Sequence, residues 1–267
     1  MPKVKVNDIE VYYEIHGQGF PLVLIAGYGC GSWLWFKQLP FFSKTFQTII
    51  FDNRGVGKTD KPDEAYSILM FADDTSGLLK HLNIIRCHVF GISMGGMIAQ
   101  QIALSYPELV EKLILCSTTF GGPNSIHIPK HTLRILASSA RLPREEGLRR
   151  NMATAFSPRY IRDNPQVFED VISHLLSNPQ PLYANQLQFR ALKDFDVEKR
   201  LQEITSPTLI LAGDKDEVIP AENSPLLHER IKESEIMMFK GSGHMVIIER
   251  AEDLNSKVTE FLLTQNE

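Results

Sequence analysis

The stretch Gly91-Ile92-Ser93-Met94-Gly95-Gly96 decides the fold of this chain, because it joins an apolar, strand-like run to a helix-like one. The run before it reads RCHVF, and the run after it reads MIAQQIALSY. Glycines flank the serine where the chain turns sharply and a Cβ atom would collide with neighbouring backbone. Such a turn lifts the Ser93 hydroxyl above a sheet, over a helix N-terminus that favours negative charge. Ser93 is therefore a candidate nucleophile; the alternative is that the glycines serve packing and Ser93 caps the helix.

Apolar runs recur on either side of this turn, and helix-like stretches separate them. Runs that are apolar on both faces are typical of parallel strands covered by helices on each side. They are Pro21–Ala26, Thr48–Phe51, His88–Phe90, Leu113–Cys116 and Thr208–Ala212. The remaining elements of this part are helices at Trp33–Phe42, Ile68–Leu82 and Met97–Ser105, and a hairpin of Val4–Val6 and Ile9–Ile15. The alternation predicts an α/β fold with a doubly wound, mostly parallel sheet.

The alternation stops between about residues 121 and 200. This stretch has no convincing buried strand, and its helix-like pieces are Leu133–Ala140, Pro143–Met152, Gln166–Leu176 and Leu182–Asp194. The buried runs resume at Pro207, and an amphipathic helix is expected near Leu254–Leu263. We therefore predict a core of residues 1–120 and 201–267, with a helical lid of residues 121–200 over the carboxyl edge of the sheet.

The composition argues against several classes of protein. The 267 residues carry a formal net charge of -4, which gives no overall basic face for nucleic acid or anionic lipid. The N-terminus lacks the apolar core of a signal peptide, and no run reaches the ~18 apolar residues of a membrane span. The three cysteines form no C-x-x-C pair, and no H-E-x-x-H motif indicates a metal site. We expect a cytoplasmic protein with no cofactor, no metal and no nucleic-acid or membrane partner; the sequence leaves a homodimer open.

A serine nucleophile needs a base, and His244 is the best-placed histidine. It lies in the flexible turn Gly241-Ser242-Gly243-His244, after the strand-like run Glu235–Phe239. His228 also follows Ser93, but its context LLHERI is typical of a helix surface. His88 lies in the strand before the serine and is interpreted as a core residue.

The base in turn needs a carboxylate that holds its tautomer and stabilises the imidazolium. Asp216 lies in the loop LAGDKDEVIP, which leaves a buried strand. Asp214 is the rival two residues away, and it could instead brace the turn. We predict Asp216 as the acid, with Asp214 as the alternative.

The intermediate of an acyl transfer needs amide donors for its oxyanion. The Met94 N–H follows the candidate nucleophile directly. A second donor is expected from the loop Ala26-Gly27-Tyr28-Gly29-Cys30-Gly31, where glycines let the backbone approach a substrate closely. We choose the Tyr28 N–H, and the alternative is a plain glycine-rich turn.

At these residues the chain resembles the α/β-hydrolase superfamily, in particular the lidded branch of 3-oxoadipate enol-lactonases, carboxylesterases and cofactor-free haloperoxidases. The resemblance covers nearly the whole chain and is weakest in the lid; it is carried by PLVLIAGYG, FDNRGVGKTDKP, GISMGGMIAQQIALSYPELVEKLIL, PTLILAGDKDEVIP and GSGHMVIIERAEDLN. It implies a nucleophile at Ser93, an acid at Asp216, a base at His244, and oxyanion amides at Tyr28 and Met94. The order Ser, Asp, His along the chain agrees with this fold. Ala26 departs from the histidine of many members, while Asp52 and Arg54 match a segment that braces the active-site loops.

The resemblance implies a serine hydrolase that cleaves a small carboxylic ester or lactone through an acyl-enzyme. Three alternatives remain: a C–C bond hydrolase, a perhydrolase with the same triad, or a receptor with little turnover. We expect a mainly apolar pocket, with candidates Tyr28, Trp33, Trp35, Phe120, Phe156 and Phe189; the alternative for each is a core residue. Arg190 could meet a substrate carboxylate; the other interpretation is a surface arginine.

Overall fold

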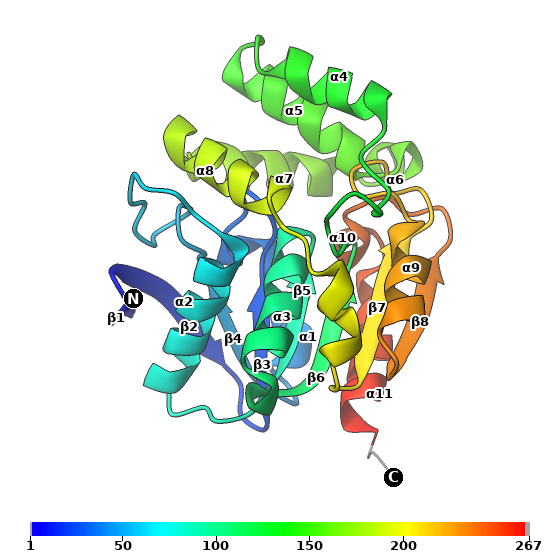
Figure 1. Cartoon of the computed structure of the whole chain (residues 1–267). Coiled ribbons are helices and arrows are strands. Elements are labelled where there is room, and N and C mark those ends of the chain that lie inside the picture. The colour runs from blue at the N-terminus through cyan, green and yellow to red at the C-terminus, as the bar shows by residue number, and fades with distance from the viewer. Residues whose placement is uncertain (1, 265–267) are drawn as a thin grey trace.

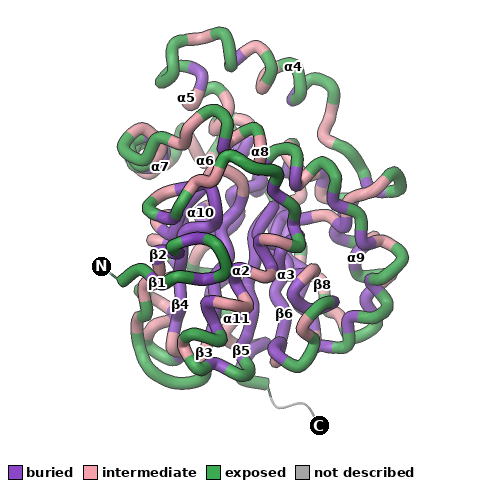
Figure 2. Tube along the Cα trace, turned by 60° about the vertical axis from the view of Figure 1, so that its left-hand side comes forward, coloured by how far each residue is buried: buried purple, intermediate pink, exposed green. Residues whose placement is uncertain are grey.

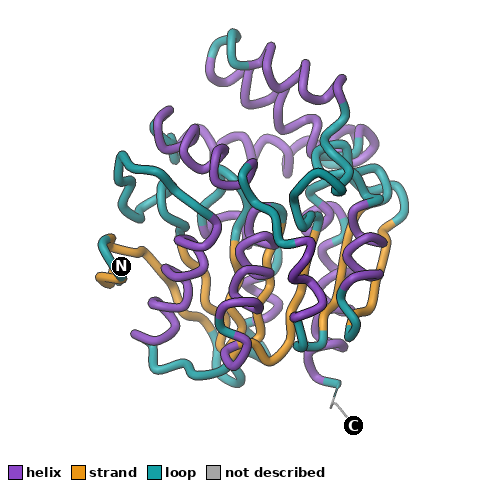
Figure 3. The backbone as a smooth tube through the Cα atoms, in the orientation of Figure 1, coloured by secondary structure: helices purple, strands orange, loops and turns teal. Residues whose placement is uncertain are grey.

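Eight strands form one sheet in the computed structural model, which describes residues 2–264 (Figures 1 and 3). Their order in the sheet is β1-β2-β4-β3-β5-β6-β7-β8. The strands are β1 (Lys3–Val6), β2 (Ile9–His16), β3 (Pro21–Ile25), β4 (Gln47–Phe51), β5 (Cys87–Ile92), β6 (Val110–Cys116), β7 (Thr208–Gly213) and β8 (Ser234–Phe239). The pairs β1–β2 and β2–β4 are antiparallel, and all pairs from β4 to β8 are parallel. The predicted hairpin and mostly parallel sheet are confirmed.

Helices cover both faces of this sheet. The helices outside residues 121–197 are η1 (Ser32–Trp35), α1 (Leu39–Phe42), α2 (Ile68–His81), α3 (Met94–Ser105), η2 (Pro107–Leu109), η3 (Glu198–Glu203), α9 (Asn223–Arg230), α10 (Val246–Glu249) and α11 (Ala251–Leu263). Val23 and Ile25 of β3 pack in one hydrophobic cluster with α2, α3 and α9, whereas Leu22 and Leu24 pack in the other with α1, α10 and α11. Alternate residues of a strand point to opposite faces, so both faces are buried, as Figure 2 shows.

Two expected helices differ in the structure. The stretch Trp33–Phe42 is not one helix but the short helices η1 and α1, because Pro40 has no amide proton for a continuous helical ladder. Helix α3 starts at Met94 rather than Met97, so it begins directly after Ser93.

Between β6 and β7, before η3, the chain forms five α-helices, which lie above the carboxyl ends of the strands in Figure 1. They are α4 (Lys130–Ser139), α5 (Arg144–Ala155), α6 (Pro158–Asp163), α7 (Pro165–Ser177) and α8 (Leu182–Lys193). An isolated bridge between Gly121 and Asp196 joins the two ends of this segment. We call residues 121–200 the helical insertion; its helix α6 was not predicted from the sequence. Within residues 2–264, no helix has the length and apolar character needed to cross a bilayer.

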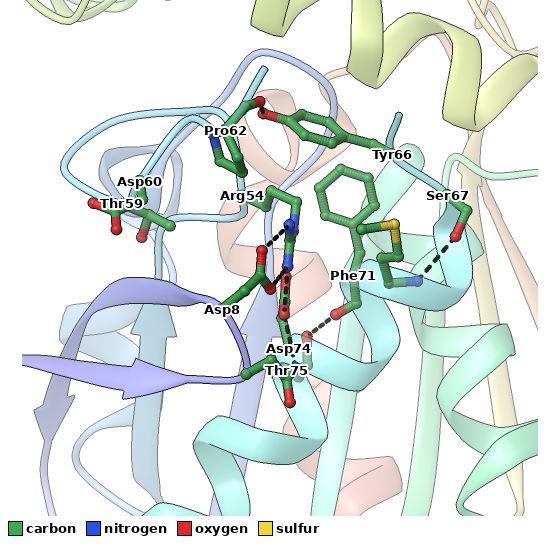
Figure 4. Close-up of polar contacts among 12 residues, drawn as sticks. Asp8, Arg54, Thr59, Asp60, Pro62, Tyr66, Ser67, Phe71, Asp74 and Thr75 are labelled. Carbon is green, nitrogen blue, oxygen red and sulfur yellow. Dashed lines mark hydrogen bonds and ion pairs between the residues drawn. The ribbon is translucent and has the colours of Figure 1, made fainter. Parts of the chain in front are cut away.

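A buried arginine fixes the loop that follows β4 (Figure 4). The Arg54 side chain is 2% exposed and donates from Nε and Nη2 to Asp74 of α2 (2.9 and 3.1 Å). Its Nη2 and Nη1 also donate to Asp8, in the β1–β2 turn (2.7 and 3.1 Å). A buried guanidinium is stable only with such paired, bidentate partners. Arg54 therefore ties the hairpin, α2 and the loop after β4 into one unit.

Candidate active site

Ser93 lies at a strained turn between β5 and α3. Its backbone has φ 57° and ψ -121°, a conformation that favours glycine. A Cβ on Gly91 would lie 2.0 Å from the Gly95 carbonyl oxygen, and one on Gly95 would lie 2.0 Å from that of Ile25. Ser93 occupies the N-cap position, but its side chain makes no capping hydrogen bond. The glycines therefore create the turn, and the alternative of Ser93 as a capping side chain is wrong.

The other predicted site residues also follow the carboxyl ends of strands. Tyr28 comes after β3, Asp216 after β7 and His244 after β8. These strands run parallel to β5, so their carboxyl ends meet at the same edge of the sheet. This topology brings residues that are far apart in sequence to one place.

His244 is held between Asp216 and the sheet. Its Nδ1 lies 2.7 Å from Asp216 Oδ2, and its carbonyl oxygen accepts a hydrogen bond from Ser117 Oγ (3.0 Å). The side chains of His244 and Asp216 are 5% and 0% exposed, so this pair is shielded from water. With a proton on Nδ1 for the carboxylate, Nε2 keeps its lone pair and can accept a proton.

The structure brings Asp216, not Asp214, to this histidine. The second oxygen of Asp216 accepts hydrogen bonds from the amides of Val218 and Ile219, both at 2.8 Å. Asp214 Oδ1 instead accepts from the Gly241 amide at 2.6 Å, in the turn before His244. The rival aspartate thus braces the histidine loop from outside.

The two other candidate histidines lie elsewhere. His228 is exposed on α9, where its Nδ1 lies 2.9 Å from Ser234 Oγ. His88 is buried in β5 against Phe20 and Phe46. Burial, with Lys112 and Arg86 nearby, lowers the pKa of His88 to about 4. Both are structural residues, as interpreted from the sequence.

Ser93 and His244 line the same cavity, which has a volume of about 400 Å³. Its apolar wall includes Leu34, Leu136, Leu148, Met152, Leu175, Val218 and Met245. Its polar wall, largely from the helical insertion, includes Arg144, Asn151, Thr154, Asn178, Gln180 and Asn185. The wall of the cavity is therefore mainly apolar, as predicted, with polar side chains contributed by the insertion.

Most aromatic residues expected in the pocket lie outside it. Tyr28 lines the cavity, but Trp33 and Trp35 line a neighbouring cavity of about 320 Å³. Phe120 and Phe156 are buried in the core, and Phe189 is exposed. Large aromatic side chains fill the interior between layers, which the sequence pattern does not distinguish from a pocket wall.

Arg190 is exposed and does not line the cavity, so the interpretation as a surface arginine holds. The guanidinium on the cavity wall belongs to Arg144 instead. It donates to the carbonyl oxygens of Leu175 and Leu176, at 3.1 and 3.4 Å, near the end of α7. Its place follows from how α5 and α7 pack, which no local pattern reveals.

The loop after β3 approaches Ser93 closely. A Cβ on Gly27 would lie 3.2 Å from Ser93 Cβ, a tight contact that glycine avoids. Gly27 and Tyr28 both line the cavity beside Ser93, and Met94 is the first residue of α3. At Ala26 the carbonyl oxygen accepts from Asn53 Nδ2 at 3.1 Å. The Tyr28 and Met94 amides are thus in the neighbourhood of Ser93, where oxyanion donors are needed.

A larger hollow, of about 710 Å³, lies at the opposite edge of the sheet. It is lined by the amino ends of β6, β7 and β8 and by mixed charges such as Arg86, Glu111 and Glu233. In sheets of this kind ligands bind at the carboxyl edge. The smaller cavity with Ser93 and His244 is therefore the candidate active site.

No group of three or more His, Cys, Asp or Glu side chains in residues 2–264 is arranged to hold a metal ion. Cys30, Cys87 and Cys116 are buried thiols without a disulfide. Burial raises the pKa of Cys30 and Cys87 to about 12, so neither is a reactive thiolate at neutral pH.

The sequence profile of the family described as "alpha/beta hydrolase fold" matches residues 21–251. The chain belongs to the α/β-hydrolase family. The predicted resemblance is confirmed at this level.

Relatives of this α/β hydrolase are named for different reactions. A 3-oxoadipate enol-lactonase of Acinetobacter baylyi is 30% identical over 94% of this chain and 92% of its own length. A putative carbamate hydrolase of Stutzerimonas stutzeri is 28% identical over 96% of this chain and 97% of its own length. The solved structure of a bromoperoxidase from Bacillus anthracis is 26% identical, with a TM-score of 0.88, over 98% of this chain and 99% of that chain. Membership of the family therefore leaves the substrate undecided.

The polar residues of the insertion in this α/β hydrolase were missed by sequence reasoning. A compositional signal exists: five of the eleven residues 178–188 (NPQPLYANQLQ) carry a carboxamide. Such density in a helix is unusual for a purely apolar lid, because carboxamides need hydrogen-bond partners when buried.

Proposed function

We propose that this α/β hydrolase cleaves a small carboxylic ester or lactone through a Ser93–His244–Asp216 triad and an acyl-enzyme. The observation that carries the proposal is the arrangement around one cavity. Ser93 and His244 line this cavity, and Asp216 lies at hydrogen-bond distance from Nδ1 of His244. A nucleophile, its base and an orienting carboxylate in this relation are the requirements for serine catalysis.

In the first half-reaction, His244 takes the proton of Ser93 as Oγ attacks the substrate carbonyl carbon. The amides of Tyr28 and Met94 stabilise the oxyanion of the tetrahedral intermediate. When the intermediate collapses, His244 gives the proton to the leaving alkoxide, which departs as an alcohol; for a lactone, it stays attached to the acyl group. Water activated by His244 then attacks the acyl-enzyme and releases the acid, and Ser93 regains its proton.

The size of the cavity and the named relatives support a small substrate. A volume of about 400 Å³ is at the lower end of ligand pockets, which suits a short acyl group. The relative from Acinetobacter baylyi is named an enol-lactonase, and lactone opening uses the same acyl-transfer steps. Apart from the substrate and one water molecule, every step in this mechanism uses side chains and amides of this chain.

The test is hydrolysis of short p-nitrophenyl esters by the wild type and by Ser93→Ala. Removing such a serine costs ~10⁶ in kcat, so activity should fall to the background rate. Ser256→Ala, an exposed serine on α11, is the matched control and should keep full activity. A fluorophosphonate probe should label the wild type and not Ser93→Ala. Undiminished ester hydrolysis by Ser93→Ala would refute the mechanism.

A substrate panel separates the alternatives that use the same triad. The panel contains esters and lactones, a ring-fission dienol ketone, and acetate with hydrogen peroxide. Highest kcat/KM on an ester or lactone supports the proposal. Preference for the ketone would indicate a C–C hydrolase, and preference for peroxide a perhydrolase. Tight binding with negligible turnover would indicate a receptor.

A further inference from the structure

Three carboxamide side chains of the helical insertion connect Tyr28 to its neighbour Gly29. Tyr28 Oη donates to Asn185 Oδ1 (2.6 Å), and Asn185 Nδ2 donates to Gln180 Oε1 (2.8 Å). Gln180 Nε2 then donates to Gln188 Oε1 (3.1 Å), which also accepts from the Gly29 amide (3.2 Å). We call Gln180, Asn185 and Gln188 the carboxamide ring, because these bonds leave the loop at Tyr28 and return at Gly29.

The bonds of the carboxamide ring all run in a consistent direction. Each carboxamide oxygen accepts and each carboxamide nitrogen donates, so turning any one amide would place like atoms against each other. Burial raises the pKa of Tyr28 to about 12, so its phenol is a donor at neutral pH. Gln188 has no exposed surface, and water cannot easily replace its bonds.

The carboxamide ring is anchored to the core through the loop after β4. Gln188 Nε2 donates to the Arg54 carbonyl oxygen at 2.7 Å, and Gln180 Nε2 donates to that of Gly55 at 3.0 Å. The Arg54 side chain is fixed by Asp8 and Asp74, as Figure 4 shows. The insertion therefore holds the Tyr28 loop against a rigid support.

Two of these hydrogen bonds hold Tyr28 in place. One is made by its own side chain to Asn185, and the other by the amide of the next residue, Gly29, to Gln188. We propose that Gln188 is a positioning residue that sets the direction of the Tyr28 amide, so that docking of the insertion completes the oxyanion site. This inference rests on the proposed function, because it assigns the Tyr28 amide to the oxyanion.

Gln188 itself does not line the cavity, whereas Tyr28, Gln180 and Asn185 do. Its loss should therefore leave substrate binding nearly intact and weaken the stabilisation of the transition state. Misplacing one oxyanion donor costs less than the 10²–10³-fold in kcat typical of its complete removal, so we expect about 10- to 100-fold.

The test compares Gln188→Met with Gln186→Met, an exposed glutamine of the same helix. We expect kcat of Gln188→Met to fall about 10- to 100-fold, with KM changed less than about threefold. Affinity for an alkyl trifluoromethyl ketone, whose serine adduct carries the oxyanion, should fall in parallel. Active sites are counted by fluorophosphonate titration, so a misfolded fraction does not mimic the effect. Unchanged kcat and inhibitor affinity in Gln188→Met would overturn the inference.

Amide hydrogen exchange of a peptide that spans Gly29 gives a second readout, independent of activity. Gln188→Met should exchange faster at this amide than the wild type and Gln186→Met. Unchanged exchange would overturn the inference even if the enzyme is active. A different outcome is that the Gly29 amide exchanges faster in Gln188→Met while Ser93→Ala keeps full activity. In that case the proposed function is wrong, but the contact between the carboxamide ring and Gly29 is supported.

Discussion

Asp216 shares its carboxylate between His244 and the backbone of its own loop. One oxygen lies 2.7 Å from His244 Nδ1, and the other accepts two amides at 2.8 Å. The carboxylate cannot rotate without losing all three contacts, so the imidazole is held in one orientation. This relationship makes the acid of the proposed triad directly testable.

Replacing Asp216 with Asn should lower kcat about 10⁴-fold, because the amide can donate to Nδ1 and thereby favour the wrong tautomer. Asp214→Asn is the matched control, since its remaining oxygen can still accept from the Gly241 amide. The control should stay within about tenfold of the wild type. Steady-state kinetics on a p-nitrophenyl ester measures both. A larger loss in Asp214→Asn than in Asp216→Asn would reverse the assignment.

Ser93→Gly should be more stable than Ser93→Ala, although both lack the nucleophile. The backbone at position 93 has φ 57°, and strain of this kind costs about 1–3 kcal/mol for a residue with a Cβ. Glycine relieves that strain but gains entropy in the unfolded chain, so we expect a net gain of about 1 kcal/mol. Urea unfolding of the two variants measures it. Equal stability would show that the relieved strain is no larger than the entropic cost of glycine, contrary to this expectation.

Arg144→Gln should weaken turnover of an ester with a carboxylate on its acyl chain more than that of a neutral ester of the same length. A charge-assisted hydrogen bond at a partly exposed site supports about a tenfold difference in kcat/KM. Arg190→Gln, an exposed arginine outside the cavity, is the control and should affect both esters equally. The idea of an acidic substrate is excluded if Arg144→Gln also affects both esters equally.

His88 should make the protein less stable in acid. Its pKa falls from about 6.5 to about 4 on folding, because the ring is buried and because Lys112 and Arg86 lie nearby. Between these values the unfolded chain binds a proton that the folded chain does not, so stability falls as the pH drops through this window. The loss should be on the order of 3 kcal/mol and complete below about pH 4.

His88→Leu should remove this part of the acid sensitivity, and His228→Leu, on the surface, should retain it. The measurement is the free energy of unfolding in urea at pH 7, 5.5 and 4.5. Curves for His88→Leu and wild type that run parallel across this range would contradict the assignment.

Much of the fold and the candidate site could be predicted from local sequence. The turn at Ser93 depends on glycines that stand close to it in sequence: Gly91 lies against Gly95, whereas the contact of Gly95 with the Ile25 carbonyl joins distant parts of the chain. The buried strands were visible because both faces of the sheet demand apolar side chains. In contrast, Pro40 divides an apolar run that was predicted to form one helix. Helix α6 lies where prolines were expected only to separate helices.

The sequence by itself determined the α/β-hydrolase fold and predicted the proposed chemistry, since the serine turn, the aspartate loop and the histidine loop are each short local patterns. Only the tertiary structure decided between Asp214 and Asp216, because contacts with Gly241, Val218 and Ile219 direct the two side chains to opposite sides of one loop. It also placed Arg144 rather than Arg190 on the cavity wall, and joined Gln188 to Gly29 across 159 residues. Such choices depend on how helices pack on one another, and packing arises from contacts between distant parts of the chain.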